Sequence, residues 1–336
     1  MSAEETSIEK GARRGGISRT AVAIIAAVVI VAALIGVAWA AGWLSPQIEF
    51  VRIDGSSTVF PITSGWAAEF STGQRQVVVG FSGTGGGFQK FCRGETDLSG
   101  ASRPIKQSEI DTCTQNGVTG IVEFLVAYDG LSVVVNKNNN WVDSLTVRQL
   151  CRIWTANTSA DACDGTGGHV TRWVELNATW PDREIDLYGP GTDSGTFDYF
   201  VEVILTPFDQ DITADFFPSE DDNVLVQAIA ADQDGLGYFG YAYAIANTAT
   251  LNLLAIDNEQ GAGPILPSEE TIKDGRYAPL SRPLFVYANS KSLGRTIVRD
   301  FLRFGYSTRG LEIVGDTGYV TLTAIEVSEQ VAKIPP

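Results

Sequence analysis

One short stretch of the chain, residues 188–200, has the residue types and the spacing of an anion-binding loop. Its first half is rich in glycine and small hydroxyl residues, and apolar residues follow at helical spacing from Phe197 onward. A strand that breaks at glycines and then starts a helix directs several free backbone N–H groups, and the positive end of the helix dipole, at one point. Ser194 and Thr196 add hydroxyl donors. The stretch is therefore predicted to bind an oxyanion.

Two further stretches repeat this order of strand, glycine-hydroxyl turn and helix. The turn at 54–61 follows an alternating apolar segment at 48–53, and the turn at 82–87 follows another at 76–81. Because glycine has no side chain, it lets the backbone approach a ligand closely. Each turn, taken singly, is also compatible with an ordinary helix N-cap. The second turn is neither a P-loop nor a dinucleotide fingerprint, since Phe88 stands where that fingerprint requires glycine.

A few charged residues stand close to these predicted elements. Arg103 ends a short predicted strand at 96–103, where its planar guanidinium could face the same cleft as the turns or form a surface ion pair, and both alternatives stay open. An Asp-Gly pair at 129–130 interrupts a long apolar run at 120–136, which predicts two strands with a break of the kind seen where a chain crosses between lobes. The single histidine, His169, is predicted to be structural or exposed.

The composition is that of a globular α/β protein. The 336 residues are enough for two lobes of ordinary size, and 44% of them are hydrophobic. The net charge of −16 argues against nucleic acid as a partner and means that an anion site must depend on local donors. With one histidine and no CxxC pair, the chain is not expected to hold zinc, and we expect no cofactor.

The four cysteines can form two local disulfides. In an oxidising compartment we expect the pairs Cys92–Cys113 and Cys151–Cys163. Spacing alone leaves the other two pairings open.

The N-terminal segment indicates the compartment. Basic residues at 10–19 precede an almost uninterrupted apolar run at 21–44, and crossing a bilayer takes about 20 residues. We expect a cytoplasmic tail at 1–19 and a single-pass anchor in the cell membrane at 20–44, with the rest of the chain on the extracytoplasmic side. A cleaved signal peptide that ends at 38–40 is the alternative.

Four motifs, in their order along the chain, resemble those of the periplasmic-type phosphate-binding proteins, which serve high-affinity phosphate ABC importers. The similarity covers residues 48–330 and implies two α/β lobes joined by a hinge, with the ligand in the cleft. The motifs are Asp54–Pro61, Gly83–Phe88, Gly94–Ile105 and Gly191–Thr196. The implied boundaries are 47–128 with 286–336 for lobe 1 and 129–285 for lobe 2.

The resemblance also implies a ligand, a set of donors and partners. The ligand would be inorganic phosphate, released unchanged to the permease subunits of an ABC importer and, through them, coupled to the ATPase. We therefore expect a binding protein and not an enzyme. A phosphate or oxyanion sensor of the same fold, not coupled to import, is the alternative. The donors carried over from the motifs are Ser57, Thr58, Val59 and Thr84 from lobe 1 and Ser194, Gly195 and Thr196 from lobe 2.

The charges differ from those of one well-known branch of this family. In that branch an aspartate occupies the position of Arg103, and an arginine lies close to the position of Pro190. Here Arg103 is expected to supply the positive charge. A carboxylate that accepts the proton of phosphate would reject sulfate, which carries no proton at neutral pH. Asp193 and Asp129 are the candidates for this acceptor.

Overall fold

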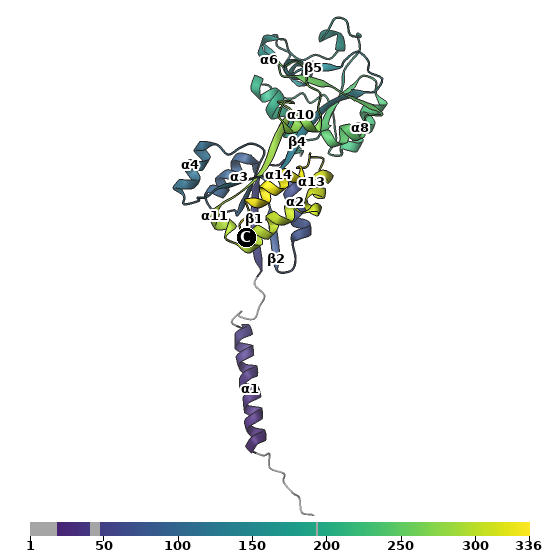
Figure 1. Ribbon diagram of the computed structural model, residues 1–336. Coiled ribbons are helices and arrows are strands. Elements are labelled where there is room, and N and C mark those ends of the chain that lie inside the picture. The colour runs from purple at the N-terminus through teal and green to yellow at the C-terminus, as the bar shows by residue number, and fades with distance from the viewer. Residues whose placement is uncertain (1–18, 41–47, 193) are drawn as a thin grey trace, which may run out of the picture. The chain divides into compact units, whose positions relative to one another are not determined.

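The structure, a computed structural model, describes residues 19–40, 48–192 and 194–336 and consists of two units, Met1–Ile48 and Glu49–Pro336. The first unit contains helix α1 (Arg19–Ala40), drawn in purple in Figure 1. Within the described ranges, no helix combines the length and the hydropathy that a bilayer crossing requires. The predicted anchor at 20–44 ends beyond Ala40, among residues outside the described part.

One mixed sheet runs through the second unit in the order β2-β1-β3-β11-β4-β8-β6-β7, with β9 paired to β4. β1 is parallel to β2 and β3, whereas β11 is antiparallel to β3 and β4. A small separate sheet pairs β5 with β10. The strands are β1 (Glu49–Gly55), β2 (Arg75–Val79), β3 (Leu98–Ala101), β4 (Val122–Asn136), β5 (Ser144–Thr146), β6 (Asp186–Gly189), β7 (Phe217–Pro218), β8 (Gly235–Gly240), β9 (Leu251–Leu253), β10 (Ala255–Asp257) and β11 (Ser281–Ala288).

The predicted break at 129–130 is wrong, because β4 continues through it as one strand of 15 residues. Asp129 stays in the strand since its side chain finds a cation, Arg282, at the facing position of β11. Gly130 is required by packing: a Cβ there would lie 2.4 Å from the side chain of Ile272. The irregularity lies instead on the neighbouring strand, as a register shift between Leu284 and Phe285.

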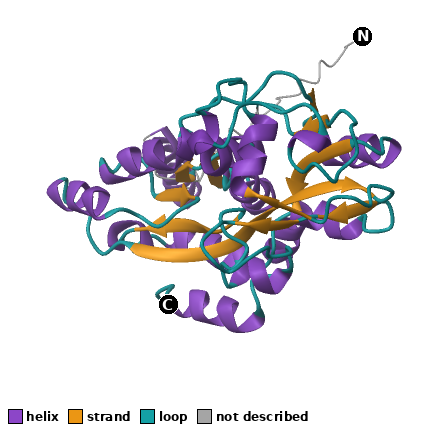
Figure 2. Ribbon diagram, turned by 90° about the horizontal axis from the view of Figure 1, so that it is seen from above, coloured by secondary structure: helices purple, strands orange, loops and turns teal. Residues whose placement is uncertain are grey.

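Helices cover both faces of the sheet, as Figure 2 shows in purple around the orange strands. Several begin directly after the strands of the sheet, which places their first turns beside the strand ends. The α-helices of this unit are α2 (Phe60–Phe70), α3 (Gly83–Cys92), α4 (Gln107–Gln115), α5 (Val147–Trp154), α6 (Ala162–Gly165), α7 (Gly195–Phe200), α8 (Asp222–Ala231), α9 (Tyr241–Ala246), α10 (Glu269–Lys273), α11 (Ser290–Leu293), α12 (Thr296–Gly305), α13 (Thr308–Asp316) and α14 (Ala324–Ala332), with a π-helical turn at Val201–Leu205 after α7.

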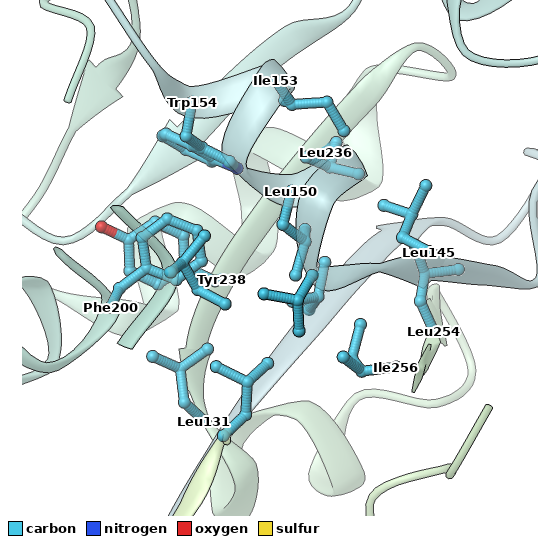
Figure 3. Packing of buried hydrophobic residues seen from close by; sticks show 14 of the residues in the cluster. Leu131, Leu145, Leu150, Ile153, Trp154, Phe200, Leu236, Tyr238, Leu254 and Ile256 are labelled. Atoms are coloured by element: carbon cyan, nitrogen blue, oxygen red, sulfur yellow. The ribbon is translucent and has the colours of Figure 1, made fainter. Parts of the chain in front are cut away.

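Two large apolar cores define the two lobes. The core of lobe 1 includes Trp66 and Phe301. The core of lobe 2 is built around Trp154, Phe200 and Tyr238, and the rings of the last two stack at 3.9 Å (Figure 3). The strand β4 contributes residues to both cores, and the chain passes from Leu280 in the core of lobe 2 to Leu284 of β11 in the core of lobe 1, so these two segments connect the lobes. This confirms the predicted two-lobed α/β fold.

Both predicted disulfides are confirmed. Cys92–Cys113 joins α3 to α4, and Cys151–Cys163 joins α5 to α6. All four cysteine side chains are buried. Each bond therefore ties a helix of one lobe to its neighbour, and the first of them fixes the helix that begins at the second glycine turn.

Candidate functional site

A polar cavity of about 260 Å³ lies where the turns of lobe 1 meet α7 and the following π-helical turn of lobe 2. Because β1 and β3 are parallel, their carboxyl ends meet at this edge of the sheet and bring the turns together. We call it the interlobe cavity. It is lined by Ser56, Ser57, Thr58, Gly83, Thr84, Gly85, Ser102, Arg103, Asp198, Glu202 and Arg282.

The first turn presents two hydroxyl side chains to the interlobe cavity, Ser57 and Thr58. Ser56 holds the turn by accepting the Thr58 N–H at 3.2 Å with its side-chain oxygen. Val59, predicted as a further N–H donor, differs from its neighbours. Its N–H donates to the Ser56 carbonyl at 3.2 Å and its side chain is 1% exposed, so the structure gives Val59 a role in packing.

The second turn brings Thr84 next to the end of β3. Thr84 Oγ1 accepts the Ser102 N–H at 3.2 Å and lies 3.1 Å from Ser102 Oγ. The turn is supported from below by the buried Asp54, whose carboxylate accepts hydrogen bonds from the side chains of Ser82 and Lys90. Hydroxyl groups from two different strand ends therefore line one wall of the cavity.

Arg103 lines the interlobe cavity, but its charge is shared. Its guanidinium donates to both carboxylate oxygens of Glu109 at 2.8 and 2.9 Å and lies 5.6 Å from the centroid of the Phe88 ring. Both alternatives for Arg103 thus hold in part, because the side chain faces the cavity and is also half of an ion pair. The Glu109 carboxylate offsets much of the charge that Arg103 was expected to supply.

Arg282, which the sequence analysis did not single out, is the second cation of the cavity. It stands at the start of β11 and donates to Thr58 Oγ1 at 2.8 Å, to Asp129 Oδ2 at 3.3 Å and to Glu202 Oε2 at 3.1 Å. Its guanidinium lies 3.4 Å from the centroid of the Tyr199 ring, and its side chain is only 11% exposed. Arg282 therefore contacts residues of both lobes from a strand that connects them.

Of the two predicted acidic acceptors, Asp129 is not among the described residues that line the cavity. Asp129 is 2% exposed and serves as the buried counter-charge of Arg282. Burial raises the pKa of the Asp129 carboxyl above its ordinary value, although the charge of Arg282 and the hydrogen bond from it act in the opposite direction. Asp193 lies outside the described residues.

Two carboxylates that the sequence analysis did not name, Asp198 and Glu202, do line the cavity. Asp198 belongs to the first turn of α7, and its Oδ2 accepts the hydroxyl of Ser57 at 3.2 Å across the lobes. Glu202 follows one helical turn later and pairs with Arg282, with its side chain 61% exposed. Lobe 2 therefore brings hydrogen-bond acceptors to the cavity.

The opening turn of α7 contacts the first turn of lobe 1 directly. A Cβ at Gly195 would lie 3.0 Å from the N and Cα atoms of Thr58, so any larger residue would push the two turns apart by a few tenths of an ångström. Ser194 caps the helix by accepting the Thr196 N–H at 3.1 Å. Residues 194–196 line a neighbouring cavity of about 510 Å³, which shares Ser57 with the interlobe cavity.

Comparison with known proteins gives the family. The model of a PBP superfamily domain matches residues 12–309. Protein SphX of Synechocystis sp. is 43% identical over 281 residues, which cover 83% of this chain and 80% of that protein. The phosphate-binding protein PstS of Staphylococcus saprophyticus is 38% identical over 287 residues, or 84% of each chain. The chain belongs to the phosphate-binding protein family.

Solved structures agree with this family. The crystal structure of a possible phosphate binding protein from Planctomyces limnophilus superposes with a TM-score of 0.78 at 38% identity and covers 86% of this chain and 100% of that one. An ABC-type phosphate transport receptor from Vibrio cholerae superposes with a TM-score of 0.58 at 20% identity, over 81% and 100% of the two chains, and supports the fold alone. The phosphate-binding protein family consists of solute binders, so the prediction that the chain is not an enzyme is confirmed by its membership.

The two missed residues carry different amounts of signal in the sequence. Asp198 follows Gly195 by three residues, so a helix that begins at the family motif places both on the same face. Arg282 has no such signal, because it precedes Pro283 in an apolar strand and is 224 residues away from its partner Thr58. Only the pairing of β11 with β4 brings it to the site.

Proposed function

We propose that the chain binds inorganic phosphate in the interlobe cavity on the extracytoplasmic side and delivers it to an ABC importer. The observation that carries the proposal is the family membership together with a cavity, at the family's motifs, that combines hydroxyl groups with two arginines. Charge-assisted hydrogen bonds from guanidinium groups and neutral ones from hydroxyls are what a tetrahedral oxyanion requires. Hinged lobes that close on the anion would release it unchanged when they open.

We propose that Arg282 is the main cation of this site. Both arginines are paired with carboxylates, but Arg282 sits between the lobes and also donates to Thr58, itself a proposed ligand residue. Ser57, Thr84 and the first turn of α7 would complete the cradle from both lobes. Asp129 would hold the Arg282 guanidinium in place from behind and would not itself contact phosphate.

We propose that Asp198 is the acceptor of the phosphate proton. It lines the cavity and accepts a hydrogen bond from Ser57 of the other lobe. Phosphate that carries a proton at neutral pH can donate a hydrogen bond to this carboxylate. Sulfate has no proton to donate, so its oxygen would face a carboxylate oxygen without an intervening hydrogen, which costs affinity.

Isothermal titration calorimetry on the full chain tests the proposal with phosphate and sulfate. Wild type should bind phosphate and give no heat with sulfate. Asp198→Asn should weaken phosphate binding by about 10–150-fold, the value of one hydrogen bond to a charged group, and should admit sulfate, because the amide can donate. Asp161→Asn, an exposed position whose side chain caps no helix, is the matched control.

Two outcomes would count against separate parts of the proposal. No heat with phosphate in wild type would overturn phosphate binding itself. Phosphate binding with sulfate still excluded by Asp198→Asn would leave phosphate as the ligand and remove Asp198 as the acceptor.

We also propose the single-pass anchor at 20–44 and the lobe boundaries 47–128 with 286–336 and 129–285. The anchor is supported by the apolar run in the sequence, which continues beyond the described part of α1. The boundary at 128/129 is supported by the division of the two cores, since Ala127 packs in one core and Leu131 in the other. At the start of β11 the cores divide between Leu280 and Leu284, a few residues before the proposed boundary at 285/286. Extraction of membranes with alkaline carbonate should leave the full chain in the membrane fraction; its release would overturn the anchor.

A further inference from the structure

A second cavity of lobe 1, of about 700 Å³, gathers positive charge at the edge of the sheet opposite the interlobe cavity. It lies beside the amino end of β3 and the carboxyl end of β11, which run antiparallel, and its lining includes residues of α11. Figure 1 shows α11 at the end of lobe 1 that faces away from lobe 2. Four cations line it, Arg52, Arg93, Lys291 and Arg295, against a single carboxylate. Such an excess is notable in a chain of net charge −16. We call it the basic cavity.

The contacts inside the basic cavity leave two of its cations uncompensated. Arg295 pairs with Asp97 at 2.6 Å, and Arg93 pairs with Glu95. Arg52 and Lys291 form no ion pair with any described residue, and both are exposed to the cavity mouth.

Two further contacts show that the floor of the basic cavity is ordered and polar. Asp97 accepts the Arg52 backbone N–H at 2.9 Å while it holds the Arg295 guanidinium, so one carboxylate ties β1 to Arg295 at this floor. The hydroxyl of Thr96, which also lines the cavity, is buried and has no hydrogen-bond partner in the described structure. A buried hydroxyl without a partner is costly unless a ligand or water satisfies it.

We infer that the basic cavity is a second oxyanion site, for a phosphoryl-bearing ligand larger than inorganic phosphate. Guanidinium groups and an ammonium group arranged around a hydroxyl match the oxygens of phosphoryl groups. The cavity is more than twice the size of the interlobe cavity, so one phosphate ion would leave most of it empty. A soluble oligophosphate and the phosphodiester headgroup of an anionic lipid share the required chemistry. The inference does not depend on phosphate binding between the lobes.

Calorimetry on the full chain in nonionic detergent tests the site with tripolyphosphate as the soluble probe. Orthophosphate just sufficient to saturate the interlobe cavity is present throughout, so that only the second site responds. We expect tripolyphosphate to bind, and Arg52→Glu and Lys291→Glu each to weaken it about tenfold, the effect of about 1.4 kcal/mol. Lys137→Glu, which reverses another exposed lysine that forms no ion pair with a described residue, is the matched control and should change nothing.

A second arm replaces part of the detergent by phosphatidylglycerol or, as the neutral control, by phosphatidylcholine. Weakened tripolyphosphate binding in phosphatidylglycerol alone identifies the lipid headgroup as the ligand. Unchanged tripolyphosphate binding in both lipids identifies a soluble phosphoryl compound. No binding of either probe, or equal binding by the Lys291→Glu and Lys137→Glu variants, would overturn the inference. Orthophosphate affinity, measured on the same variants, should stay at the wild-type value and so reports separately on the interlobe cavity.

Discussion

The buried ion pair between Arg282 and Asp129 makes a quantitative test of how the connecting strands bring charge to the site. The two side chains are 11% and 3% exposed, and Arg282 Nε lies 3.3 Å from Asp129 Oδ2. Arg282→Leu leaves a buried carboxylate without its partner, which costs about 3–5 kcal/mol of unfolding free energy. The lost hydrogen bond to Thr58 adds about 1 kcal/mol. We expect a total loss of about 4–6 kcal/mol.

A second substitution separates the unpaired charge from the lost packing. Asp129→Leu in the Arg282→Leu background removes the unpaired carboxylate, and apolar residues often replace a buried ion pair without loss of stability. The double variant should therefore regain about 2 kcal/mol or more, and the coupling energy of the double-mutant cycle should reach about 2–3 kcal/mol.

The single variant should also become sensitive to pH. Burial raises the pKa of Asp129, and Arg282 opposes that rise, so the folded-state pKa climbs further when Arg282 is removed. A raised folded-state pKa gives stability that is fully present below the unfolded pKa of about 3.9 and is lost as the pH rises through the folded pKa. The deficit of Arg282→Leu should therefore shrink as the pH falls from about 7 to about 5, and the double variant should not show this change.

Urea denaturation followed by circular dichroism measures these quantities at each pH. A loss below about 1 kcal/mol in Arg282→Leu, or a double variant whose loss equals the sum of the two single losses, would refute the reasoning, because the pair would then be uncoupled. Calorimetry with phosphate adds an independent readout. Both Arg282→Leu and the double variant should bind phosphate at least about tenfold more weakly, because the double substitution restores stability and not the charge.

Two further predictions concern the contact between the lobes and the disulfides. Gly195→Ala would place a Cβ 3.0 Å from the backbone of Thr58 and push the two turns apart, so the Kd for phosphate in calorimetry should rise about tenfold. Gly73→Ala, where a Cβ meets nothing within 4 Å, should bind as wild type. Equal affinities of the two variants would contradict the contact. Replacing Cys92 and Cys113 by serine opens a crosslink between positions 21 residues apart and should lower the unfolding free energy by about 3 kcal/mol in urea denaturation. Because α3 begins at the second turn, the variant without Cys92–Cys113 should also bind phosphate more weakly. The serine variant of Cys151 and Cys163 should lose stability but keep its phosphate affinity. Weaker phosphate binding by this second variant would contradict the prediction that only the first disulfide supports the site.

The sequence was sufficient for the parts of the site that depend on local structure. A glycine-hydroxyl turn between a strand and a helix is determined by neighbouring residues, so the turns at Ser57, Thr84 and Ser194 could be identified before any tertiary contact was known. Both disulfides could be predicted for the same reason, since each closes a short loop. The break expected at 129–130 failed because tertiary packing, and not local propensity, keeps that segment extended.

Most charges of the site could not be derived in the same way, because their partners lie far along the chain: Arg282 and Asp129 are 153 residues apart, and Asp198 and Ser57 are 141 apart. The pair of Arg103 and Glu109, six residues apart, is local. From the sequence, Arg103 could face the cleft or form an ion pair, and the structure shows it in the cavity and bound to Glu109. Arg282 looked like part of an apolar strand and reaches the cavity. Acidic residues followed the same pattern, since Asp129 serves a structural ion pair and Asp198 faces the proposed ligand. Which charge is available to a ligand depends on pairings that only the fold determines.

The position of Arg282 bears on how the site would open and close. The residue belongs to a strand that connects the lobes, and it contacts Thr58 on one side and Glu202 and Tyr199 on the other. Separation of the lobes must break one set of these contacts while the buried Asp129 keeps the guanidinium attached to the connecting strands. An entering anion would then meet a cation that is already held in place and has lost a partner. The interaction of the anion with Arg282 would replace that partner and so favour closure of the lobes. The main charge of the proposed site would then belong to the strands that connect the lobes and not to either lobe.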